Sequence, residues 1–469
     1  MYTERRIEPA SADHQGSVDM SASHATQLTQ LYDSWSGSSL TPSSRASARM
    51  GILDILGCIV AGSQTHTAAT VRELAIEQGS AQQAAVFGTG VRLSVPLAAL
   101  VNGVAGHVLD YDDMNATLIG HPSVVLVPAI MALGEARAMS GSAFLDAYVL
   151  GFEIAAHFAR TMVPRHYDAG WHTTSSIGIF GAAAACSRVL GLDARGMLNA
   201  LAIAASNVAG LRANFGSETK SLHAGQAAEG GVRAAMLAAR GFTANVGLFD
   251  APDGLFATYG ANPVPKEAPL DEALEIDASG IGIKPYACCG AGISVIDVML
   301  DLHEGGLPPV EDLLDIDCAV TSIATRIMPL QQAANGLEGK YCIAYCAAVA
   351  YLDGAGGLAQ FDDARVQRED VQALMKRVNV RVAPHLASGA GRFGVELTLR
   401  RRDGTTLAAQ VELPRGHPHR TLSSAALLRK FTDCATPVLG GERTTEVAGI
   451  VAALEELADI RQLSAMLQP

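Results

Sequence analysis

The stretch Gly106–Ser123, GHVLDYDDMNATLIGHPS, interrupts two apolar segments that both have helical spacing. Those flanking segments, residues 95–105 and 124–141, consist mainly of small and aliphatic residues. The interruption contains the ionisable residues His107, Asp110, Asp112, Asp113 and His121. Because unpaired carboxylates are costly to bury, a charged segment between core helices is expected at the edge of a cavity. We therefore expect other polar segments of the chain to lie against this one.

The composition favours a mainly α fold with more than one domain. At 469 residues the chain exceeds what a single hydrophobic core usually serves, so two domains are expected. Hydrophobic residues make up 49% of the chain, aromatic residues only 5%, and there are 47 glycines. Such a composition is typical of closely packed helices of small residues rather than of an aromatic-rich β-sandwich.

Charge and hydropathy argue against two classes of partner. The net charge of −13 is spread along the chain without a basic block, whereas nucleic-acid binding depends on Lys and Arg residues that neutralise phosphates. No run of about 18 uninterrupted apolar residues occurs, so no membrane span is expected. We expect no nucleic-acid and no membrane partner, although a local cationic pocket can still bind an anionic substrate.

The N-terminus and the cysteines bear on compartment. Residues 1–26 are polar and lack the charged and apolar regions of a secretory leader, so a disordered N-terminal lead is expected. The eight cysteines form no CxxC pair and no zinc or iron–sulfur spacing. Most lie in Ala-rich apolar surroundings, where a free cysteine acts as a small hydrophobic residue. A reducing compartment is the simplest interpretation, and we predict a cytoplasmic protein.

Two further polar segments lead directly into helical segments rich in Ala and Gly. The first, residues 161–176, is TMVPRHYDAGWHTTSS, and the second, residues 211–225, is LRANFGSETKSLHAG. Polar loops held on rigid helices are a common way of building a binding site. We therefore expect both segments to approach the acidic stretch described above.

Near residue 274 the spacing of apolar residues changes from helical to partly strand-like. Residues 275–292 and 315–328 alternate like strands, and Asp403–Gly404 is a strong hairpin turn signal. Clefts between two domains are preferred sites for small ligands. The predicted organisation is a large all-helical domain (27–273 and 416–469) with an inserted smaller α+β lid domain (274–415), preceded by the disordered lead (1–26).

The first candidate for chemistry is His121, which directly precedes a helix. Free backbone N–H groups at a helix start favour an anion, so this histidine could transfer a proton and bind a carboxylate. Alternatively, it caps the helix or packs at the edge of the core. Asp110, Asp112 and Asp113 could orient the imidazole or raise its pKa. Asp112 or Asp113 could instead be a helix-terminal or turn carboxylate.

The other polar segments supply further candidates, each with a structural alternative. His172 is either a catalytic imidazole or a loop histidine bonded to a hydroxyl. Lys220, with Arg212 upstream, is a carboxylate clamp or proton carrier, whereas on its own it would be a solvated surface lysine. His223 binds substrate beside Lys220 or caps the following helix.

Lys284 lies in IKPYACCG, and Pro285 biases its backbone towards an extended conformation, so a packing or turn role is the alternative to a role in binding. The adjacent Cys288 and Cys289 make a poor metal clamp. The glycine-rich GAGISV lacks the dinucleotide fingerprint, and no HExxH, GxSxG or phosphate-loop motif occurs. We expect no metal and no cofactor. The remaining histidines, lysine and aspartate suit proton transfer at a carbon next to a carboxylate.

Several long motifs, in the same order over roughly residues 27–460, resemble the MmgE/PrpD family. They are LDYDD (109–113), GHPS (120–123), GWHTTSSIGIFGAAAAC (170–186), ETKSLHAGQAAEGG (218–231), IKPYACC (283–289) and GLEGKYCIAYCAAVAYLDG (336–354). The resemblance implies a large helical domain with a smaller α+β lid, a homodimer, and no metal requirement in the decarboxylase and epimerase branches.

The resemblance also implies roles for individual residues. Lys284 matches the lysine of the lid motif, and Tyr345 is implied to reach the pocket from the lid. We add His223 and Arg212 as substrate-binding candidates because they lie near Lys220 in the sequence. The catalytic residues that the resemblance implies are Asp110, His121, His172 and Lys220.

Some positions depart from the family pattern. The lid motif is often KPYPCC followed by an arginine, with a histidine nine residues after the lysine; here these positions hold Ala287, Gly290 and Ile293. A threonine that is usual after the acidic pair is Met114. The missing lid histidine bears on which reaction of the family carries over.

The implied function is that of a metal-free lyase acting on a small di- or tricarboxylate by proton abstraction next to a carboxylate. The family members that exemplify this reaction type are 2-methylcitrate dehydratase and cis-aconitate decarboxylase. One alternative is a cofactor-independent epimerase of an amino- or imino-dicarboxylate such as iminodisuccinate. Another, from a different class, is a non-catalytic protein that binds small acids.

Overall fold

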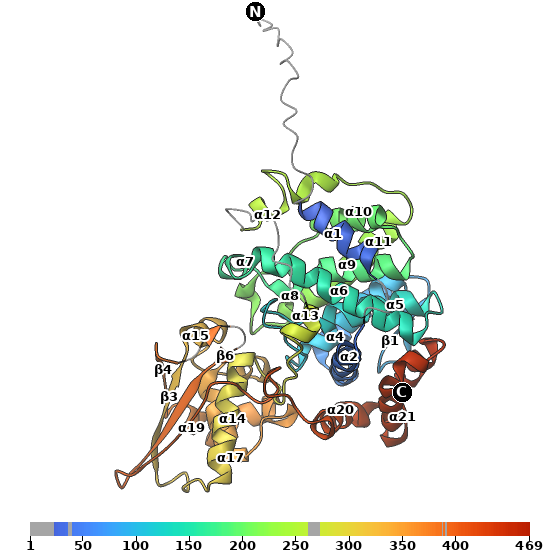
Figure 1. Ribbon diagram of the computed structural model, residues 1–469. Helices are drawn as coiled ribbons and strands as arrows, with labels where there is room; N and C mark the ends of the chain where they lie inside the picture. The colour runs from blue at the N-terminus through green and yellow to red at the C-terminus, as the bar shows by residue number, and fades with distance from the viewer. Residues whose placement is uncertain (1–22, 36–39, 261–272, 387, 390–391) are drawn as a thin grey trace, which may run out of the picture.

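The protein has two parts, a large helical domain and a smaller α+β lid domain (Figure 1). The predicted mainly α fold class is confirmed. Most of the predicted lead, residues 1–22, lies outside the described residues, and helix α1 already begins at His24. The computed structural model describes residues 23–35, 40–260, 273–386, 388–389 and 392–469.

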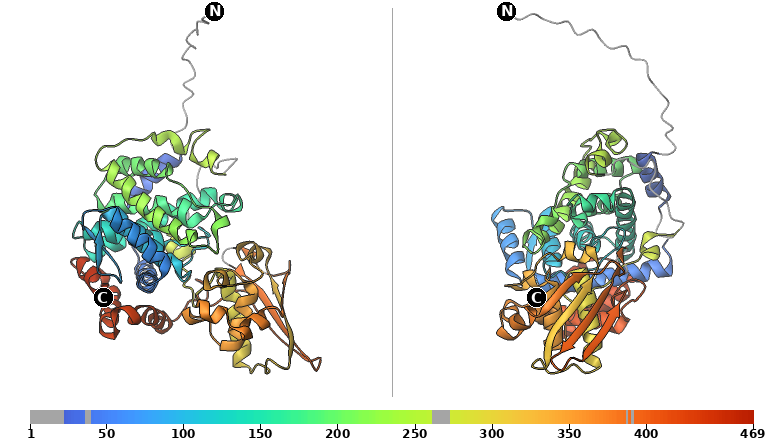
Figure 2. Two further views of the ribbon diagram at one scale, coloured as in Figure 1. Left: turned by 180° about the vertical axis from the view of Figure 1, so that it is seen from behind. Right: turned by 90° about the vertical axis from the view of Figure 1, so that its left-hand side faces the viewer.

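The helical domain is assembled from elements that precede and follow the lid in the sequence. The preceding elements are α1 (His24–Ser34), α2 (Pro42–Gly62), α3 (His66–Glu77), β1 (Ala84–Val86), β2 (Val91–Leu93), α4 (Val95–Val108), α5 (Ser123–Glu135), α6 (Gly141–Met162), α7 (Arg165–Asp168), α8 (Thr173–Ser176), α9 (Gly178–Val189), α10 (Ala194–Ala205), η3 (Arg212–Asn214), α11 (Thr219–Ala238), η4 (Val246–Phe249), α12 (Leu255–Thr258) and α13 (Glu275–Ala278). The following elements are α20 (Ser424–Leu439), α21 (Gly441–Ala452), η6 (Leu454–Glu456) and α22 (Arg461–Met466). Helix α20 packs against α2, which returns the chain to this domain (Figure 2).

Small residues set how closely these helices approach one another. At the contact between α4 and α11, a Cβ added to Gly103 would lie only 2.7 Å from the Cα of Gly225. The backbones therefore touch with no side chain between them. Because α4 ends just before Asp110 and Lys220 lies in the first turn of α11, this contact fixes the distance between two polar segments that are far apart in the sequence.

The lid is built on a sheet with strand order β4–β3–β7–β8. Strand β3 pairs in parallel with β4 and antiparallel with β7, and β7 pairs antiparallel with β8 across the turn at Asp403 and Gly404. Helices α14 and α17 pack against the sheet (Figure 1). The lid elements are α14 (Gly290–Glu304), β3 (Leu313–Val320), α15 (Ser322–Ile327), α16 (Gly336–Gly339), α17 (Ile343–Asp353), η5 (Leu358–Phe361), α18 (Asp363–Val366), α19 (Glu369–Met375), β4 (Val378–Val382), β5 (Ser388–Gly389), β6 (Arg392–Phe393), β7 (Val395–Arg401) and β8 (Thr406–Val411).

The chain crosses between the two domains twice, and the crossings are tied together. On the first crossing, Gly282 exchanges two backbone hydrogen bonds with Met114, each 2.7 Å long. The next residue, Ile283, donates its N–H to the carbonyl oxygen of Gly416 on the second crossing, at 2.8 Å. Gly416 has φ +85° and no room for a Cβ, which would lie 1.9 Å from the Ile283 oxygen. Both crossings thus pack against the polar segment after α4.

Three segments differ from their predicted structure. Residues 275–292 contain α13 and the start of α14 rather than a strand, because their backbone groups pair with loops and not with another strand. Residues 315–328 form the end of β3 and then α15, which begins after Thr321. The helical domain is not purely helical, since β1 and β2 form a small antiparallel hairpin.

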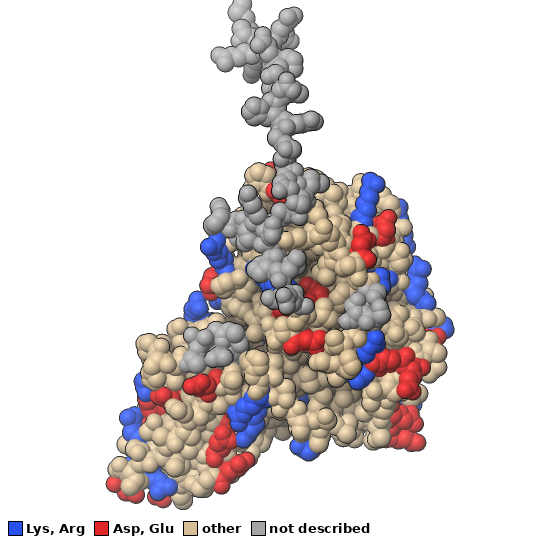
Figure 3. All heavy atoms as spheres, in the orientation of Figure 1, with Lys and Arg blue, Asp and Glu red and all other residues tan. Residues whose placement is uncertain are grey.

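Surface charge and helix length bear on the nucleic-acid and membrane partners against which the sequence argues. On the face drawn in Figure 3, Lys and Arg side chains are interspersed with Asp and Glu. Within the described residues, no individual helix has both the length and the apolar character of a membrane span, although the bent pair α2–α3, with 82° between its helices, satisfies that criterion jointly by length and composition.

Candidate active site

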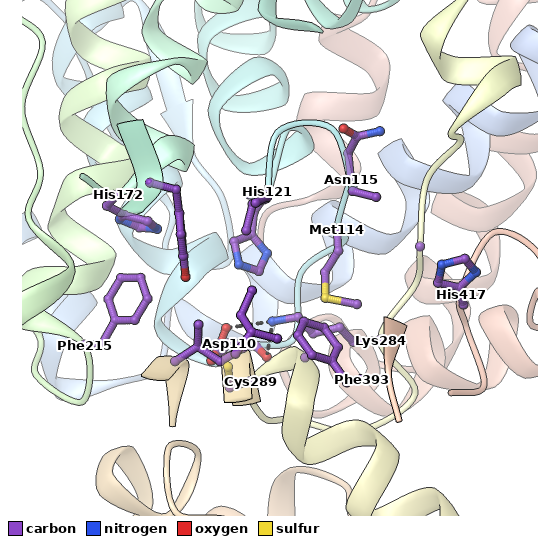
Figure 4. A pocket seen from close by; sticks show the side chains of 18 of the residues that line it. Asp110, Met114, Asn115, His121, His172, Phe215, Lys284, Cys289, Phe393 and His417 are labelled. Atoms are coloured by element: carbon purple, nitrogen blue, oxygen red, sulfur yellow. Dashed lines mark hydrogen bonds and ion pairs between the residues drawn. The ribbon is translucent and has the colours of Figure 1, made fainter. Parts of the chain in front are cut away.

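A cavity of about 120 Å³ lies between the helical domain and the lid (Figure 4). All three polar segments identified in the sequence reach it. The first contributes Asp110 and His121, the second His172, and the third Lys220. Lys284, on the first crossing between the domains, completes this group. The structure therefore brings together residues that are up to 174 positions apart in the chain.

Asp110 is the centre of the charged part of the cavity. Its Oδ1 accepts hydrogen bonds from Lys220 Nζ at 2.9 Å and from Lys284 Nζ at 2.7 Å. Lys284 Nζ also donates to the backbone oxygen of Asp110 at 3.0 Å. Asp110 has φ +48°, in the left-handed region that Asp tolerates better than most residues. This conformation lets its side chain and its carbonyl oxygen meet the same ammonium group.

The two lysines keep Asp110 ionised. Burial alone would raise the pKa of the Asp110 carboxyl, but the charges of Lys220 and Lys284 hold it well below its usual value. Burial would likewise lower the pKa of Lys284, yet the carboxylates of Asp110 and Asp112 raise it. Lys284 and Asp110 are therefore both charged at neutral pH. Two ammonium groups share one carboxylate, which leaves a net positive charge for an anionic ligand.

His121 has a defined tautomer. Its Nδ1 lies 2.6 Å from the backbone oxygen of Asp113, and a carbonyl oxygen can only accept, so Nδ1 carries the proton. Burial lowers the pKa of His121 to about 3, although the nearby Asp112 carboxylate opposes this shift. The ring is thus neutral at pH 7, with a lone pair on Nε2. A neutral imidazole of this kind can act as a base towards a group bound in the cavity.

His107 and Asp112 support His121 from behind. His107 Nδ1 donates to Asp112 Oδ2 at 2.8 Å, and the same oxygen lies 3.6 Å from His121 Nδ1. The His107 ring packs edge-on against His121 and is stacked on His172, with centroid distances of 4.9 Å and 5.5 Å. His107 lies in the last turn of α4. Its contacts position the imidazoles of His121 and His172, which both reach the cavity.

Asp113 binds the start of helix α5, whereas its neighbour Asp112 binds His107. Its carboxyl accepts hydrogen bonds from Ser123 N at 3.3 Å and Ser123 Oγ at 2.5 Å, at the start of α5. Ser123 Oγ is also within 2.6 Å of the Tyr148 hydroxyl. Burial raises the pKa of Asp113 well above its usual value. Asp113 is therefore the helix-terminal carboxyl of the acidic segment, and its backbone oxygen fixes the tautomer of His121.

His172 and His223 form a buried pair. Their Nδ1 atoms are 3.1 Å apart, so one ring donates and the other accepts. Burial lowers the pKa of His172 well below its usual value and that of His223 to about 4, so both rings are neutral at pH 7. His172 Nε2 is buried without a hydrogen-bond partner among the described residues. His172 lines the cavity, whereas His223 lies behind it and orients its ring.

Like His223, the candidates Tyr345 and Arg212 do not line the cavity. Tyr345 is fully buried in the lid, where its hydroxyl donates to the backbone oxygen of Gln360. Arg212 stacks on the Tyr167 ring, 4.1 Å from its centroid, and donates to the Tyr167 carbonyl oxygen at 2.8 Å. Its contact with the cavity is indirect, because Tyr167 itself is part of the lining.

Other lining residues were missed by the sequence analysis. Tyr341, four positions before Tyr345, faces Asp110, whose charge adds to burial in raising the pKa of the tyrosine; the geometry falls short of a hydrogen bond. His417 lies on the second crossing between the domains. One signal for it exists, since the tripeptide Gly-His-Pro occurs both at 120–122 and at 416–418. The sequence alone does not show which of Tyr341 and Tyr345 faces the cavity, because that depends on where α17 begins.

Among the described residues, His107, Asp112 and His121 form the only cluster with the arrangement of a metal site, with ligand atoms within 4.8 Å of one another. However, Nδ1 of His107 is engaged by Asp112 and Nδ1 of His121 by the Asp113 carbonyl. These hydrogen bonds account for the close spacing. The cluster therefore needs no metal ion to explain why its three side chains lie together.

The cavity places ammonium groups beside neutral imidazoles, an arrangement that suits acid–base chemistry on a small anion. The chain belongs to the MmgE/PrpD family, because the models of the MmgE/PrpD N-terminal domain and C-terminal domain match residues 26–268 and 286–456. Its relatives include cis-aconitate decarboxylase of Mus musculus, 31% identical over 90% of this chain and 89% of that protein. The corresponding protein of Homo sapiens is 30% identical, over 89% of each chain, and that of Aspergillus terreus is 25% identical, over 90% and 91%.

These comparisons support an enzyme with lyase-type function, as the sequence predicted. The non-catalytic alternative is left without support. The relatives act on a small carboxylate, which agrees in kind with the ammonium groups of the cavity.

Proposed function

We propose that this protein is a decarboxylating lyase that acts on a small di- or tricarboxylate without a metal or an organic cofactor. The observation that carries the proposal is the pair of ammonium groups on Asp110, beside imidazoles whose pKa values are lowered by burial. Preorganised cations stabilise charge that develops on a carboxylate, and nearby imidazoles transfer protons. The named activity of the relatives adds independent support.

The chemistry assigns a role to each group. One substrate carboxylate binds Lys220 and Lys284. The bond from carbon to a second carboxylate breaks, CO2 leaves, and the electron pair forms a new C=C bond. The pair of the original double bond moves to the carbon next to the lysine-bound carboxylate. That carbon is protonated by His172, which takes up a proton when the anion binds, while His121 serves as the second proton-transfer group.

The test combines an NMR assay with a matched pair of variants. Incubation with cis-aconitate in D2O should release CO2 and give new vinyl signals with one deuterium at the adjacent carbon. His172→Gln should lower kcat at least about 100-fold. His385→Gln, which changes an exposed lid histidine, should leave kcat unchanged. Release of CO2 from none of a panel of di- and tricarboxylates, or full activity of His172→Gln, would refute the proposal.

Epimerisation is the second candidate. It is favoured by the presence of two separate imidazoles, His121 and His172, that both line the cavity. Inversion of a carbon centre needs one group to remove a proton and another to return it, and no leaving group. In the same D2O assay an epimerase would exchange hydrogen in an amino- or imino-dicarboxylate without net loss of substrate. A dehydratase would give vinyl signals without CO2.

We further propose a homodimer in the cytoplasm, on the basis of the family resemblance and of eight free, buried cysteines. Light scattering coupled to gel filtration tests the dimer, and cell fractionation tests the compartment. For the absence of a metal, dialysis against a strong chelator should leave kcat unchanged. Loss of activity that Zn²⁺ or another divalent cation restores would contradict this part.

A further inference from the structure

The cavity has two chemically different parts. One holds Asp110, Lys220 and Lys284 together with the imidazoles of His121 and His172. The other is apolar, and Figure 4 shows Met114 and Phe393 on the opposite side of His121 from His172. The lid helix α15 contributes two more apolar residues to the lining, Ile323 and Ile327. We call Met114 and Phe393 the apolar wall.

The apolar wall is held in place by its packing. A Cβ added to Gly290 would lie 3.0 Å from Met114 Sδ and 3.1 Å from Phe393 Cε2, so both side chains pack closely over this glycine. The backbone of Met114 is fixed by its two hydrogen bonds with Gly282. The wall is thus a defined surface formed by both domains, and a ligand group that contacts it is selected for apolar character.

The charges of the cavity limit the number of carboxylates that it can accept. Among the described lining residues there is no arginine, and the two lysines face one aspartate, which leaves one net positive charge. Asp112, behind His121, adds further negative charge. His417 also lines the cavity, and its Nδ1 accepts a backbone hydrogen bond from His419 at 3.1 Å. A third carboxylate against the apolar wall would have to share the single net positive charge with the other carboxylates of the ligand, which is unfavourable.

The proposed reaction itself requires only two carboxylates. One leaves as CO2, and the other, at the far end of the C=C bond, accepts the displaced electron pair. Glutaconate (pent-2-enedioate) has both, and cis-aconitate is glutaconate with a third carboxylate on the central carbon. That third group takes no part in bond breaking.

We propose that the preferred substrate is a glutaconate whose central carbon bears an alkyl group, which lies against the apolar wall. This inference rests on the proposed decarboxylase function. The reaction balances: the substrate dianion and one proton give CO2 and the anion of a 3-alkyl-but-3-enoic acid. The new C=C bond uses the electron pair of the broken C–C bond, and the proton goes to the carbon next to the remaining carboxylate.

A matched substrate series tests this inference. Four acids of the same chain geometry differ only at the central carbon, which carries hydrogen, methyl, propyl or carboxylate, and kcat/KM is measured by CO2 release. The methyl and propyl acids should exceed both glutaconate and cis-aconitate by at least about tenfold, the scale of discrimination by apolar pockets. If cis-aconitate or glutaconate is the best substrate, the inference fails while the proposed function stands. If none of the four releases CO2, the proposed function fails.

Variants of the wall provide a second measurement. Met114→Gln keeps the length of the side chain and makes it polar. It should lower the ratio of kcat/KM for the propyl acid to kcat/KM for cis-aconitate at least about tenfold. Leu428→Gln, at a leucine that is 46% exposed in the helical domain, is the control and should change neither. An equal loss on both substrates, with unchanged thermal stability, would show that Met114 does not select the alkyl group and would overturn the inference.

Discussion

Lys284 donates two hydrogen bonds to Asp110, one to the side chain at 2.7 Å and one to the backbone oxygen at 3.0 Å. The lysine lies on the chain that enters the lid, whereas the aspartate follows helix α4 of the helical domain. Neither residue is exposed by more than 3%. The contact thus joins the two domains through a buried charge pair at the cavity itself.

Replacing Lys284 should therefore reduce stability as well as activity. Lys284→Met leaves the Asp110 backbone oxygen unpaired and removes one of the two cations that stabilise its carboxylate. Loss of one partner of a buried pair typically costs about 3–5 kcal/mol. We expect a decrease in the free energy of unfolding near the lower value, because Lys220 remains, and a large decrease in kcat/KM. Urea denaturation measures the first quantity. The exposed Lys376→Met should change it by less than about 0.5 kcal/mol.

The pair of His172 and His223 predicts a graded effect on catalysis. His223→Leu removes the partner of His172 Nδ1 and frees the ring to rotate, so kcat should fall about tenfold with little change in KM. His223→Asn keeps a hydrogen-bonding group near the same place and should recover part of kcat. If Leu and Asn variants are equally active, His223 does not position His172. Circular dichroism checks that both variants are folded.

Buried neutral histidines predict how stability changes with pH. The pKa of His121 is about 3 in the folded protein, against about 6.5 in an unfolded chain. Between these values the unfolded chain binds the extra proton, so stability falls as the pH decreases from about 6.5. The slope for this residue is up to about 1.4 kcal/mol per pH unit. His121→Gln should have a shallower loss between pH 7 and pH 5, measured by urea denaturation at each pH. An unchanged slope would contradict the lowered pKa.

The space around two helical glycines, one in the contact between α4 and α11 and one in α21, predicts opposite effects of the same substitution. A Cβ on Gly225 would lie 2.4 Å from the Leu100 carbonyl oxygen, so Gly225→Ala forces α11 away from α4. We expect a loss of about 1–3 kcal/mol and lower kcat/KM, since Lys220 moves with the helix. Gly449 lies within α21 with nothing within 4 Å of an added Cβ, so Gly449→Ala should stabilise by about 0.5–1 kcal/mol. Thermal unfolding compares the two variants.

Much of the fold could be predicted because it depends on local patterns. Runs of Ala and Gly at helical spacing mark the helices, and Asp403–Gly404 marks the β7–β8 turn. The segment around Gly282 could not be assigned in this way. Its apolar alternation resembles a strand, but its hydrogen-bond partners are Met114 and Gly416, which are distant in the sequence.

Part of the candidate site could also be predicted from the sequence. Asp110 and Lys220 belong to polar segments between apolar helices, a pattern that is visible in the sequence. The choice between Tyr341 and Tyr345 depends on where α17 begins, since Tyr345 lies inside its first turn and Tyr341 before it. Likewise, the stacking of Arg212 on Tyr167 is a long-range contact with no local signal.

The two crossings between the domains have one more consequence. Lys284 directly follows Ile283, whose N–H binds Gly416 on the second crossing, so the junction of the two domains also holds the cationic centre. A lid movement that displaces this junction would also separate Lys284 from Asp110. The position of the lid and the charge of the cavity are linked in this way.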